Sequence, residues 1–248
     1  MNTLRIAAAV VCAPIGETEG NLEKVVHWTK IAGNRGVRLI CFPEMNLTGY
    51  DHTADVNEHA ETIPGTTTTT LTELAGDTGV TILAGMAEKD PTGKLYIVHL
   101  VASPEGNLAV YRKLHLAPPE QALFSAGADI PLFSVDKTTF SIQLCYDAHF
   151  PELTTRMALA GADVVFIPHA SPSRMTVQDK HQSWMRHLPA RAYDNGLFIV
   201  ACNQTGDNGN GLHFPGNAVI IDPSGNILDK KLDGNEGQIG RASCRERV

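Results

Sequence analysis

Short runs of β-branched and aliphatic residues recur along the chain, and segments with apolar residues at helical spacing lie between them. In residues 21–36, for example, Leu22, Val25 and Ile31 recur near a 3.6-residue period. This alternation predicts an α/β fold with a mixed sheet, or two stacked sheets covered by helices. The predicted strands are 4–11, 37–42, 80–86, 95–101, 109–112, 140–144, 164–168, 197–202, 216–221 and 226–228, and the predicted helices are 21–36, 67–77, 151–160 and 179–195.

Three segments fit this pattern less simply. The helix over 179–195 is expected to kink at Pro189, because proline removes a helical hydrogen bond. The five threonines at 66–70 are interpreted as a helix-capping loop, and the polar segment 51–61 as a loop. No linker rich in proline, glycine or serine divides the chain and no internal repeat is visible, so we predict one domain.

Composition narrows the class of protein. The 248 residues are 43% hydrophobic, and 20 basic against 27 acidic side chains give a net charge of −7, so neither nucleic acid nor an anionic membrane is an expected partner. No apolar run approaches the length of a membrane-spanning helix. The cysteines are few, odd in number and far apart, which argues against a disulfide scaffold and for a reducing, cytoplasmic location. They are Cys12, Cys41, Cys145, Cys202 and Cys244, of which Cys12, Cys41 and Cys202 are expected in the core.

Three polar residues follow predicted strands, where sites of α/β proteins are built: Glu44, Lys113 and Cys145. Cys145 precedes a predicted helix, whose N-terminus should lower the pKa of the thiol and favour the thiolate. A nearby carboxylate could accept the thiol proton, and an ammonium group could stabilise an oxyanion. Taken singly, each residue also has an ordinary interpretation: a small core cysteine, a capping glutamate and a solvated lysine.

The surrounding strings make the interpretation specific. FPEMNLTGY, YRKLHL and LCYDAHFPE contain these three residues, and PHASP, RAYDNG and FPGNAVIIDPSG follow. Together, from Leu4 to about Gly237, the chain resembles the nitrilase (carbon–nitrogen hydrolase) superfamily. The resemblance implies a four-layer α-β-β-α sandwich of two stacked mixed sheets, and a homodimer or higher oligomer formed through one face.

The resemblance also implies roles for individual residues. Cys145 would be the nucleophile, Glu44 the general base and then acid, and Lys113 the support for the oxyanion. The backbone N–H of Tyr146 would be a second oxyanion donor. Glu120 resembles a second glutamate that many members place beside the lysine to orient the substrate, although an exposed loop acid is an equal alternative.

A substrate pocket is implied less directly. Tyr50 and His115 lie within the matching strings, and His169 and Ser171 occupy a segment that often lines the family's pocket. His149 departs from the family pattern, which often has an arginine there. Since a neutral imidazole cannot copy the paired hydrogen bonds of a guanidinium, this loop or a pocket contact is expected to differ.

The activity implied is hydrolysis of a small amide or N-carbamoyl compound through a thioester on the cysteine, with water as the second reactant. No metal or organic cofactor is expected. A helically spaced set that could hold a metal, His52, Asp55 and His59, lacks a cysteine partner and is interpreted as a solvated loop. Two alternatives stay open: hydrolysis of a nitrile with the same three residues, and a non-catalytic binding protein on the same fold.

The C-terminal residues change in character. The string from Ile239 to Val248 resembles the translation of a short-read sequencing adapter over ten successive codons; a natural basic tail is the alternative. We therefore expect a carbon–nitrogen hydrolase domain at 1–237, truncated at its C-terminus, and a non-native tail at 238–248 that contains Cys244. The strand that usually follows a glycine like Gly237 would then be missing and would leave a sheet edge unpaired.

Overall fold

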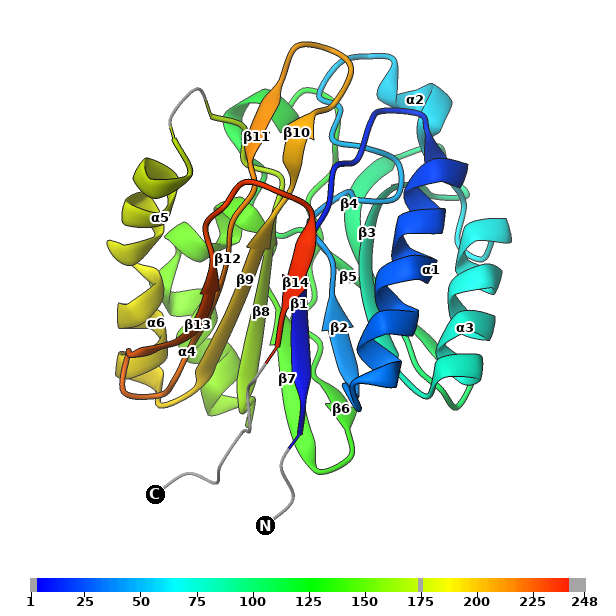
Figure 1. Ribbon diagram of the computed structural model, residues 1–248. Coiled ribbons are helices and arrows are strands. Elements are labelled where there is room, and N and C mark those ends of the chain that lie inside the picture. The colour runs from blue at the N-terminus through cyan, green and yellow to red at the C-terminus, as the bar shows by residue number, and fades with distance from the viewer. Residues whose placement is uncertain (1–3, 174–175, 241–248) are drawn as a thin grey trace.

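Two six-stranded sheets lie face to face, and helices cover the outer face of each (Figure 1). The computed structural model describes residues 4–173 and 176–240. In spatial order, the first sheet contains β14 (Gly237–Ile239), β1 (Ile6–Val10), β2 (Leu39–Cys41), β3 (Thr81–Lys89), β4 (Leu95–Ala102) and β5 (Leu108–Arg112). The second contains β13 (Ile227–Lys231), β12 (Ala218–Ile221), β9 (Phe198–Asn203), β8 (Val164–His169), β7 (Thr138–Ile142) and β6 (Phe133–Val135).

The remaining elements connect or cover these sheets. A hairpin is formed by β10 (Thr205–Asp207) and β11 (His213–Pro215). The α-helices are α1 (Thr18–Asn34), α2 (Val56–His59), α3 (Thr66–Thr78), α4 (Pro151–Leu159), α5 (Val177–Met185) and α6 (Leu188–Asn195), and two short 3₁₀ helices are η1 (Pro118–Glu120) and η2 (Cys145–His149). In the part of the chain that the structure describes, no helix combines the length and the apolar character needed to cross a bilayer.

The two sheets follow one plan of strand direction. In the first, β1, β2 and β3 are parallel, while β14 on one side and β4 and β5 on the other are antiparallel to their neighbours. In the second, β7, β8 and β9 are parallel, with β6 on one side and β12 and β13 on the other running antiparallel. Both sheets are therefore mixed, and the carboxyl ends of their parallel strands carry the loops that build the site.

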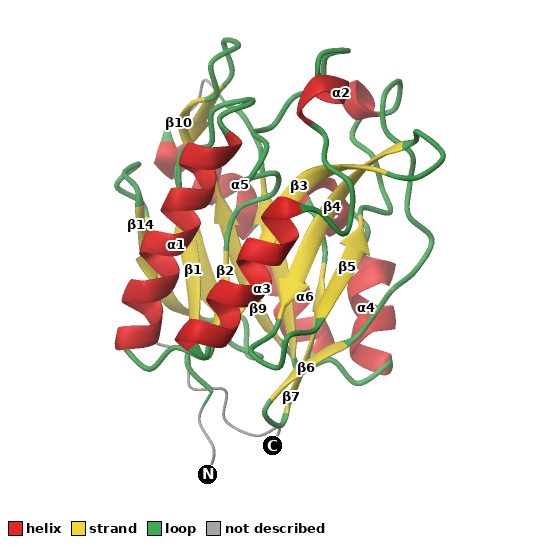
Figure 2. Cartoon of the chain, turned by 90° about the vertical axis from the view of Figure 1, so that its right-hand side faces the viewer, coloured by secondary structure: helices red, strands yellow, loops and turns green. Residues whose placement is uncertain are grey.

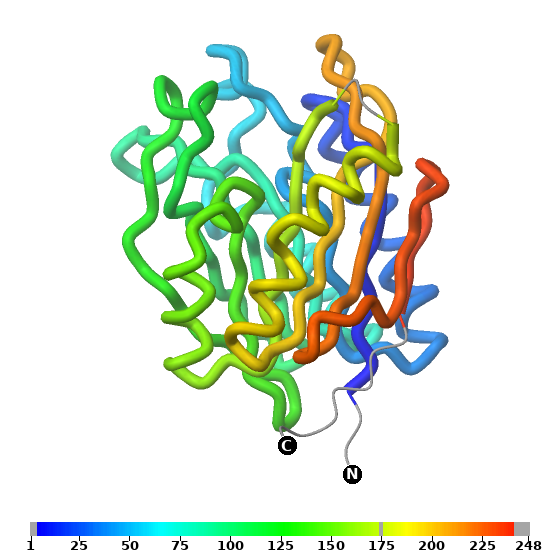
Figure 3. The backbone as a smooth tube through the Cα atoms, turned by 90° about the vertical axis from the view of Figure 1, so that its left-hand side faces the viewer, coloured from blue at the N-terminus to red at the C-terminus, as the bar shows by residue number. Residues whose placement is uncertain are grey.

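Three apolar layers hold the sandwich together. The inner faces of the two sheets pack on each other, with residues such as Leu39, Phe140 and Phe166 fully buried. Helices α1 and α3 cover the first sheet (Figure 2), and α5 and α6 lie over the second (Figure 3). This is the four-layer α-β-β-α arrangement expected from the sequence, with strands read as continuous apolar runs because both of their faces are buried.

The helices differ from the prediction in three places. The segment expected as one helix over 179–195 forms two, α5 and α6, with the break at Arg186 and His187 and with Pro189 in the first turn of α6. Proline is favoured there because its missing N–H would have no helical acceptor. The threonine run belongs to α3, since Thr69 and Thr70 donate their hydroxyls to carbonyls four residues earlier. The short helix α2 lies within the segment expected to be a loop.

The C-terminal strand, β14, crosses the predicted boundary at residue 237. Strand β14 pairs with β1 in an antiparallel register that places Ile239 opposite Ala8, and the Ile239 side chain is buried. Gln238 and Ile239 thus belong to the sheet and pair with β1, while the boundary at 237 and the origin of the tail stay predictions. The rest of the predicted tail, including Cys244, lies outside the described residues.

Candidate active site

A buried lysine bridges two carboxylates where loops from the first sheet meet. Lys113, directly after β5, donates from Nζ to Glu44 Oε1 and to Glu120 Oε1, each at 2.8 Å. All three side chains are almost completely inaccessible to solvent. Because an isolated buried charge is costly, this arrangement requires at least one carboxylate to remain ionised opposite the ammonium. The structure thus brings Glu44, Lys113 and Glu120 together. Glu120 is buried, so it is not the exposed loop acid of the alternative interpretation.

Glu44 is fixed by contacts from both sheets. Its second carboxylate oxygen, Oε2, accepts a 2.8 Å hydrogen bond from the backbone N–H of Ala170, which follows β8 in the second sheet. Its backbone carbonyl accepts another from the Gln204 side chain at 2.8 Å. With Oε1 bonded to Lys113 and Oε2 bonded to Ala170, these bonds fix the orientation of the Glu44 carboxylate.

The turn that carries Glu44 lies directly on β3. Leu47 donates its backbone N–H to Gly85, and Gly85 donates its own to the Asn46 side chain. A Cβ at Gly85 would lie 2.5 Å from the backbone nitrogen of Met45, closer than any side chain permits. Met45 itself has a φ of 51°, a strained value for a residue with a side chain. Glycine at position 85 is thus what lets the turn approach the strand.

Cys145 occupies a second strained turn. It is the first residue of η2, shortly after β7, and has a φ of 45°. A non-glycine residue in this region costs of the order of 1–3 kcal/mol and is retained when the surroundings fix it, often at functional sites. Cys145 and Tyr146 are partly exposed, whereas Glu44 and Lys113 behind them are buried. The strand, sharp turn and helix expected from the sequence are present.

The charges of the buried pair act on the thiol. Burial raises the pKa of Cys145 above its usual value, the Glu44 carboxylate raises it further, and Lys113 partly opposes both. The expectation that a helix N-terminus would lower the pKa of this thiol is therefore wrong: η2 is a short 3₁₀ helix, and desolvation and the adjacent carboxylate dominate. The resting thiol keeps its proton until a base removes it.

The same buried environment shifts the pKa values of Glu44 and Lys113. Burial raises the pKa of Glu44, and the charge of Lys113 opposes this rise. Burial alone would lower the pKa of Lys113, but Glu44, Cys145 and Glu120 more than offset it, so that the pKa lies above its usual value and the ammonium stays charged. The site thus holds a permanent cation beside a carboxylate of raised basicity.

Asp147 connects the turn that carries Cys145 to β5 and the segment that follows it. Its carboxylate accepts hydrogen bonds from the Tyr111 hydroxyl at 2.7 Å, from the backbone N–H of Leu144 at 2.9 Å, and from both the backbone N–H and Nδ1 of His115 at 2.8 Å. Tyr111 and His115 flank Lys113 in the chain. The sequence motifs do not predict this role for Asp147, because Tyr111 and His115 lie more than 30 residues away in the chain.

Several predicted pocket residues serve as supports. Tyr50 is buried and donates its hydroxyl to Glu120 Oε1 at 2.9 Å. His115 is committed to Asp147 and stacks on Phe150, with ring centroids 3.7 Å apart. His169 is buried beside Trp184, and its Nδ1 lies 2.8 Å from the Ile167 carbonyl.

Ser171 and His149 lie nearer to solvent. Ser171 is partly buried and exchanges two hydrogen bonds with the Asn203 side chain. His149 is exposed and stacks with His187 at 5.2 Å between centroids. At the neighbouring position, the carbonyl of Ala148 accepts a hydrogen bond from Arg191 of α6. A guanidinium therefore contacts this loop from another element.

Further residues near the site had no role in the sequence prediction. Gln204 holds the Glu44 backbone, and Lys180 of α5 hydrogen-bonds Ser171 Oγ. Spatial contact identifies them: Lys180 lies within α5, and Gln204, although it directly follows β9, belongs to none of the matching strings. Among the other thiols, Cys41 and Cys202 are buried as predicted, but Cys12 is partly exposed just beyond the end of β1.

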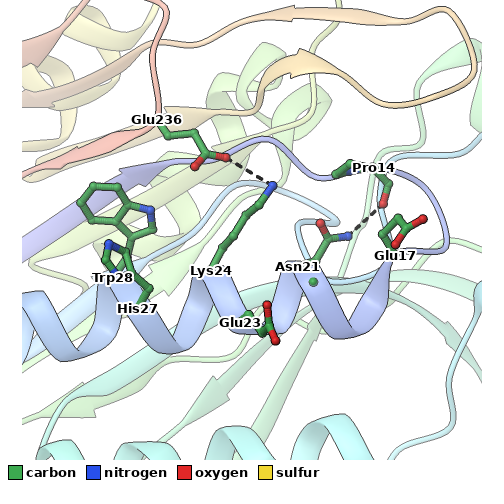
Figure 4. A pocket seen from close by; sticks show the side chains of 9 residues that line it. Pro14, Glu17, Asn21, Glu23, Lys24, His27, Trp28 and Glu236 are labelled. Atoms are coloured by element: carbon green, nitrogen blue, oxygen red, sulfur yellow. Dashed lines mark hydrogen bonds and ion pairs between the residues drawn. The ribbon is translucent and has the colours of Figure 1, made fainter.

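A separate groove runs along α1 (Figure 4). Lys24 pairs with Glu236 across it at 3.3 Å, and Asn21 donates to the Pro14 carbonyl at 2.9 Å. None of the predicted site residues lines it. The groove therefore belongs to the outer helical layer, apart from the Glu44–Lys113–Cys145 cluster.

Comparison with known proteins places this arrangement in context. Residues 6–246 match the sequence model of the family described as Carbon-nitrogen hydrolase. A nitrilase from Pyrococcus abyssi is 33% identical over 243 residues, covering 96% of this chain and 88% of that protein. A 2-oxoglutaramate amidase from Bacillus subtilis is 34% identical over 207 residues, covering 82% of this chain and 76% of its own.

Solved structures agree with the sequence relatives. An amidase from Nesterenkonia sp. AN1, in a variant bound to butyramide, superposes with a TM-score of 0.86 at 26% identity, covering 97% of this chain and 90% of that one. Another variant of that amidase, with the same score and coverage, shows covalent addition of the acetamide moiety of fluoroacetamide at its active site cysteine. By its sequence and by its four-layer fold, the chain belongs to the carbon–nitrogen hydrolase family of enzymes.

Proposed function

We propose that the protein hydrolyses small amides through a thioester on Cys145, with Glu44 as the proton carrier and Lys113 as the oxyanion support. The observation that carries this proposal is the buried Lys113, hydrogen-bonded to Glu44 and Glu120 and close enough for its charge to act on the Cys145 thiol. A nucleophile, a base and a fixed cation are the groups that acyl transfer needs.

The first half of the reaction forms the acyl-enzyme. Glu44 takes the thiol proton of Cys145 as sulfur attacks the amide carbonyl carbon, and the carbonyl oxygen becomes an oxyanion. Lys113 and the backbone N–H of Tyr146 stabilise this charge. The C–N bond then breaks, and the amine or ammonia leaves with the proton from Glu44, so that a neutral thioester remains.

The second half releases the acid. Glu44 accepts a proton from water as the oxygen attacks the thioester carbonyl. The C–S bond then breaks, the leaving sulfur takes that proton from Glu44, and the carboxylic acid and the thiol of Cys145 are formed. A carboxylate whose pKa is raised by burial suits this double role, because it gains and loses a proton near neutral pH more readily than an exposed one. Glu120 keeps Lys113 aligned throughout.

The named relatives favour amides as substrates. One relative is an (R)-stereoselective amidase from a Pseudomonas species, 32% identical over 215 residues that cover 86% of this chain and 75% of that protein. Together with the 2-oxoglutaramate amidase and the butyramide-bound amidase, it supports a small amide. The nitrilase relative supports nitrile hydrolysis as the second candidate.

A panel of three substrates tests the proposal: butyramide, N-carbamoylglycine and butyronitrile. Wild-type protein is expected to hydrolyse the amide fastest, and Cys145→Ala and Glu44→Gln should each lose at least about 10³-fold in kcat/KM while remaining folded. Cys12→Ala, which removes a partly exposed thiol elsewhere, serves as the control and should keep full activity. Hydrolysis that survives in Cys145→Ala, or no hydrolysis of any of the three by wild type, would overturn it.

We also propose that copies associate through the outer face formed by α4 and α6. Leu159 of α4 and Tyr193 of α6 are 83% and 67% exposed, so an interface that covers them would remove their apolar surface from water. Sedimentation of wild type as a dimer, and of Leu159→Asp as a monomer, is the expected result; a wild-type monomer would overturn this assembly.

A further inference from the structure

A second lysine approaches the site from α5. Lys180 is partly buried, and its Nζ hydrogen-bonds Ser171 Oγ. Ser171 is held by two hydrogen bonds with Asn203, and the preceding residue, Ala170, donates its N–H to Glu44. The Lys180 ammonium therefore contacts Ser171, and the residue next to Ser171 in the chain, Ala170, hydrogen-bonds the proposed general base, Glu44.

Lys180 differs from Lys113 in having no carboxylate partner. Lys113 bonds two carboxylates, whereas within residues 4–173 and 176–240 no aspartate or glutamate lies within ion-pair distance of Lys180. A partly buried ammonium that contacts only a hydroxyl is incompletely compensated for the water it has lost. Burial accordingly lowers its pKa, and the charge of the Cys145 thiolate would raise it.

The other basic groups near Lys180 are either imidazoles of lowered pKa or cations that already have hydrogen-bond partners. Loss of contact with water lowers the pKa of His149, His169 and His187, and the charge of Lys180 lowers it further at each. Arg191 is engaged with the Ala148 carbonyl. Lys113 is paired with two carboxylates, so Lys180 is the cation that acts on Cys145 without a carboxylate partner among the described residues.

We propose that Lys180 binds an anionic group of the substrate, so that the enzyme prefers short amides carrying a carboxylate on the acyl chain over neutral amides of the same length. The proposal rests on the proposed function, since it names the class of amide that the Cys145 site accepts. The substrate carboxylate would pair with the Lys180 ammonium, which has no carboxylate partner among the described residues. The hydroxyl of Ser171 would hold the ammonium in position for this pairing.

The direct test compares two substrates of the same shape, succinamate and butyramide. Wild type should show a higher kcat/KM for succinamate. Lys180→Met, which keeps the aliphatic stem, should lower the ratio of the two kcat/KM values by about 10- to 100-fold, and Lys180→Arg should hold it within about threefold. The exposed Lys30→Met of α1 is the matched control. A ratio unchanged in Lys180→Met overturns the proposal, because a lysine that only braces the loop would affect both amides equally.

A second measurement does not need turnover. Iodoacetate is an anion and iodoacetamide is neutral, but both alkylate the thiolate of Cys145. The ratio of the iodoacetate rate to the iodoacetamide rate therefore does not depend on the thiolate fraction. Lys180→Met should lower this ratio and Lys30→Met should not; a ratio that Lys180→Met leaves unchanged counts against the anion site. Should wild type hydrolyse no amide while the ratio still falls, the proposed function fails and the anion site stands. Should Cys145-dependent hydrolysis occur with both ratios unaffected, the anion site fails alone.

Discussion

The hydroxyl of Tyr111 donates a 2.7 Å hydrogen bond to the carboxylate of Asp147, and this bond joins the last strand of one sheet to the cysteine turn of the other. Tyr111 lies two residues before Lys113, and Asp147 lies two residues after Cys145. This buried side-chain pair, together with the His115 bonds to the same carboxylate, thus holds the segment of the proposed cation beside the turn of the proposed nucleophile.

Asp147→Asn should disturb this arrangement without touching any reacting atom. Both carboxylate oxygens of Asp147 accept hydrogen bonds, whereas the asparagine amide has one oxygen that accepts and an NH₂ group that only donates. The hydrogen bonds from Leu144 and His115 therefore cannot all be kept. We expect a loss of about 2 kcal/mol or more in the free energy of unfolding and about 10²-fold in kcat/KM. Tyr111→Phe, which removes one donor, should cost less in both; an Asp147→Asn enzyme with wild-type kinetics would contradict the positioning role.

Gly85→Ala should displace the turn that carries Glu44. The added Cβ would meet the Met45 backbone nitrogen at 2.5 Å and His99 Nδ1 at 2.9 Å, so the turn must move away from β3. We expect destabilisation of about 1–3 kcal/mol and a fall in kcat/KM of about 10²-fold. Gly76→Ala in α3 is the matched control, because its nearest contact is an ordinary 3.8 Å and alanine favours a helix by about 0.5–1 kcal/mol. Equal behaviour of the two variants in denaturation and kinetics would contradict this account.

The pH profile should report the raised pKa of Glu44. The base must be ionised to accept the thiol proton, so kcat/KM should fall as the pH drops through a value above 4.5, the usual pKa of a glutamate. Since Lys113 remains protonated above its usual 10.5, its titration should cause no loss of activity below pH 10. Initial rates between pH 4 and 10, with circular dichroism to verify folding, check this. An acid limb centred at or below 4.5 would be inconsistent with a buried base.

Acid stability should depend on a core histidine. Burial lowers the pKa of His99 to about 3, so between pH 6.5 and 3 it is neutral in the fold and protonated in the unfolded chain. The unfolded state then binds more protons, and the free energy of unfolding falls with falling pH by at most about 1.4 kcal/mol per unit for this group. His99→Gln should flatten the pH dependence in chemical denaturation, whereas the exposed His27→Gln should not. Parallel curves for His99→Gln and wild type would refute the assignment.

The sequence predicted the layers of the fold better than its helix boundaries. All ten predicted strands correspond to strands of the two sheets, and the central ones, such as β8 and β9, appear as uninterrupted apolar runs because both of their faces are buried. The break between α5 and α6 was misplaced because a proline in the first turn of a helix and a proline at a kink have similar sequence patterns. The short strands β6, β10, β11 and β14 lack a recognisable run of their own and form by pairing with neighbours.

At the site, the motifs identified the charged residues but not what holds them. Glu44, Lys113 and Cys145 were found because each follows a strand within a recognisable string. Asp147, Gln204 and Lys180 act through partners that only the tertiary fold brings near, and the thiol pKa was misjudged because burial cannot be read from a helix terminus.

Rapid-quench mass spectrometry of the Cys145 peptide during turnover of a small amide tests the central claim most directly. The account predicts a peptide heavier by the acyl group minus one hydrogen, formed while substrate lasts and absent in Cys145→Ala, with a mass that identifies the acyl half. Turnover of the amide with no adduct on Cys145, and with activity retained in Cys145→Ala, would contradict it.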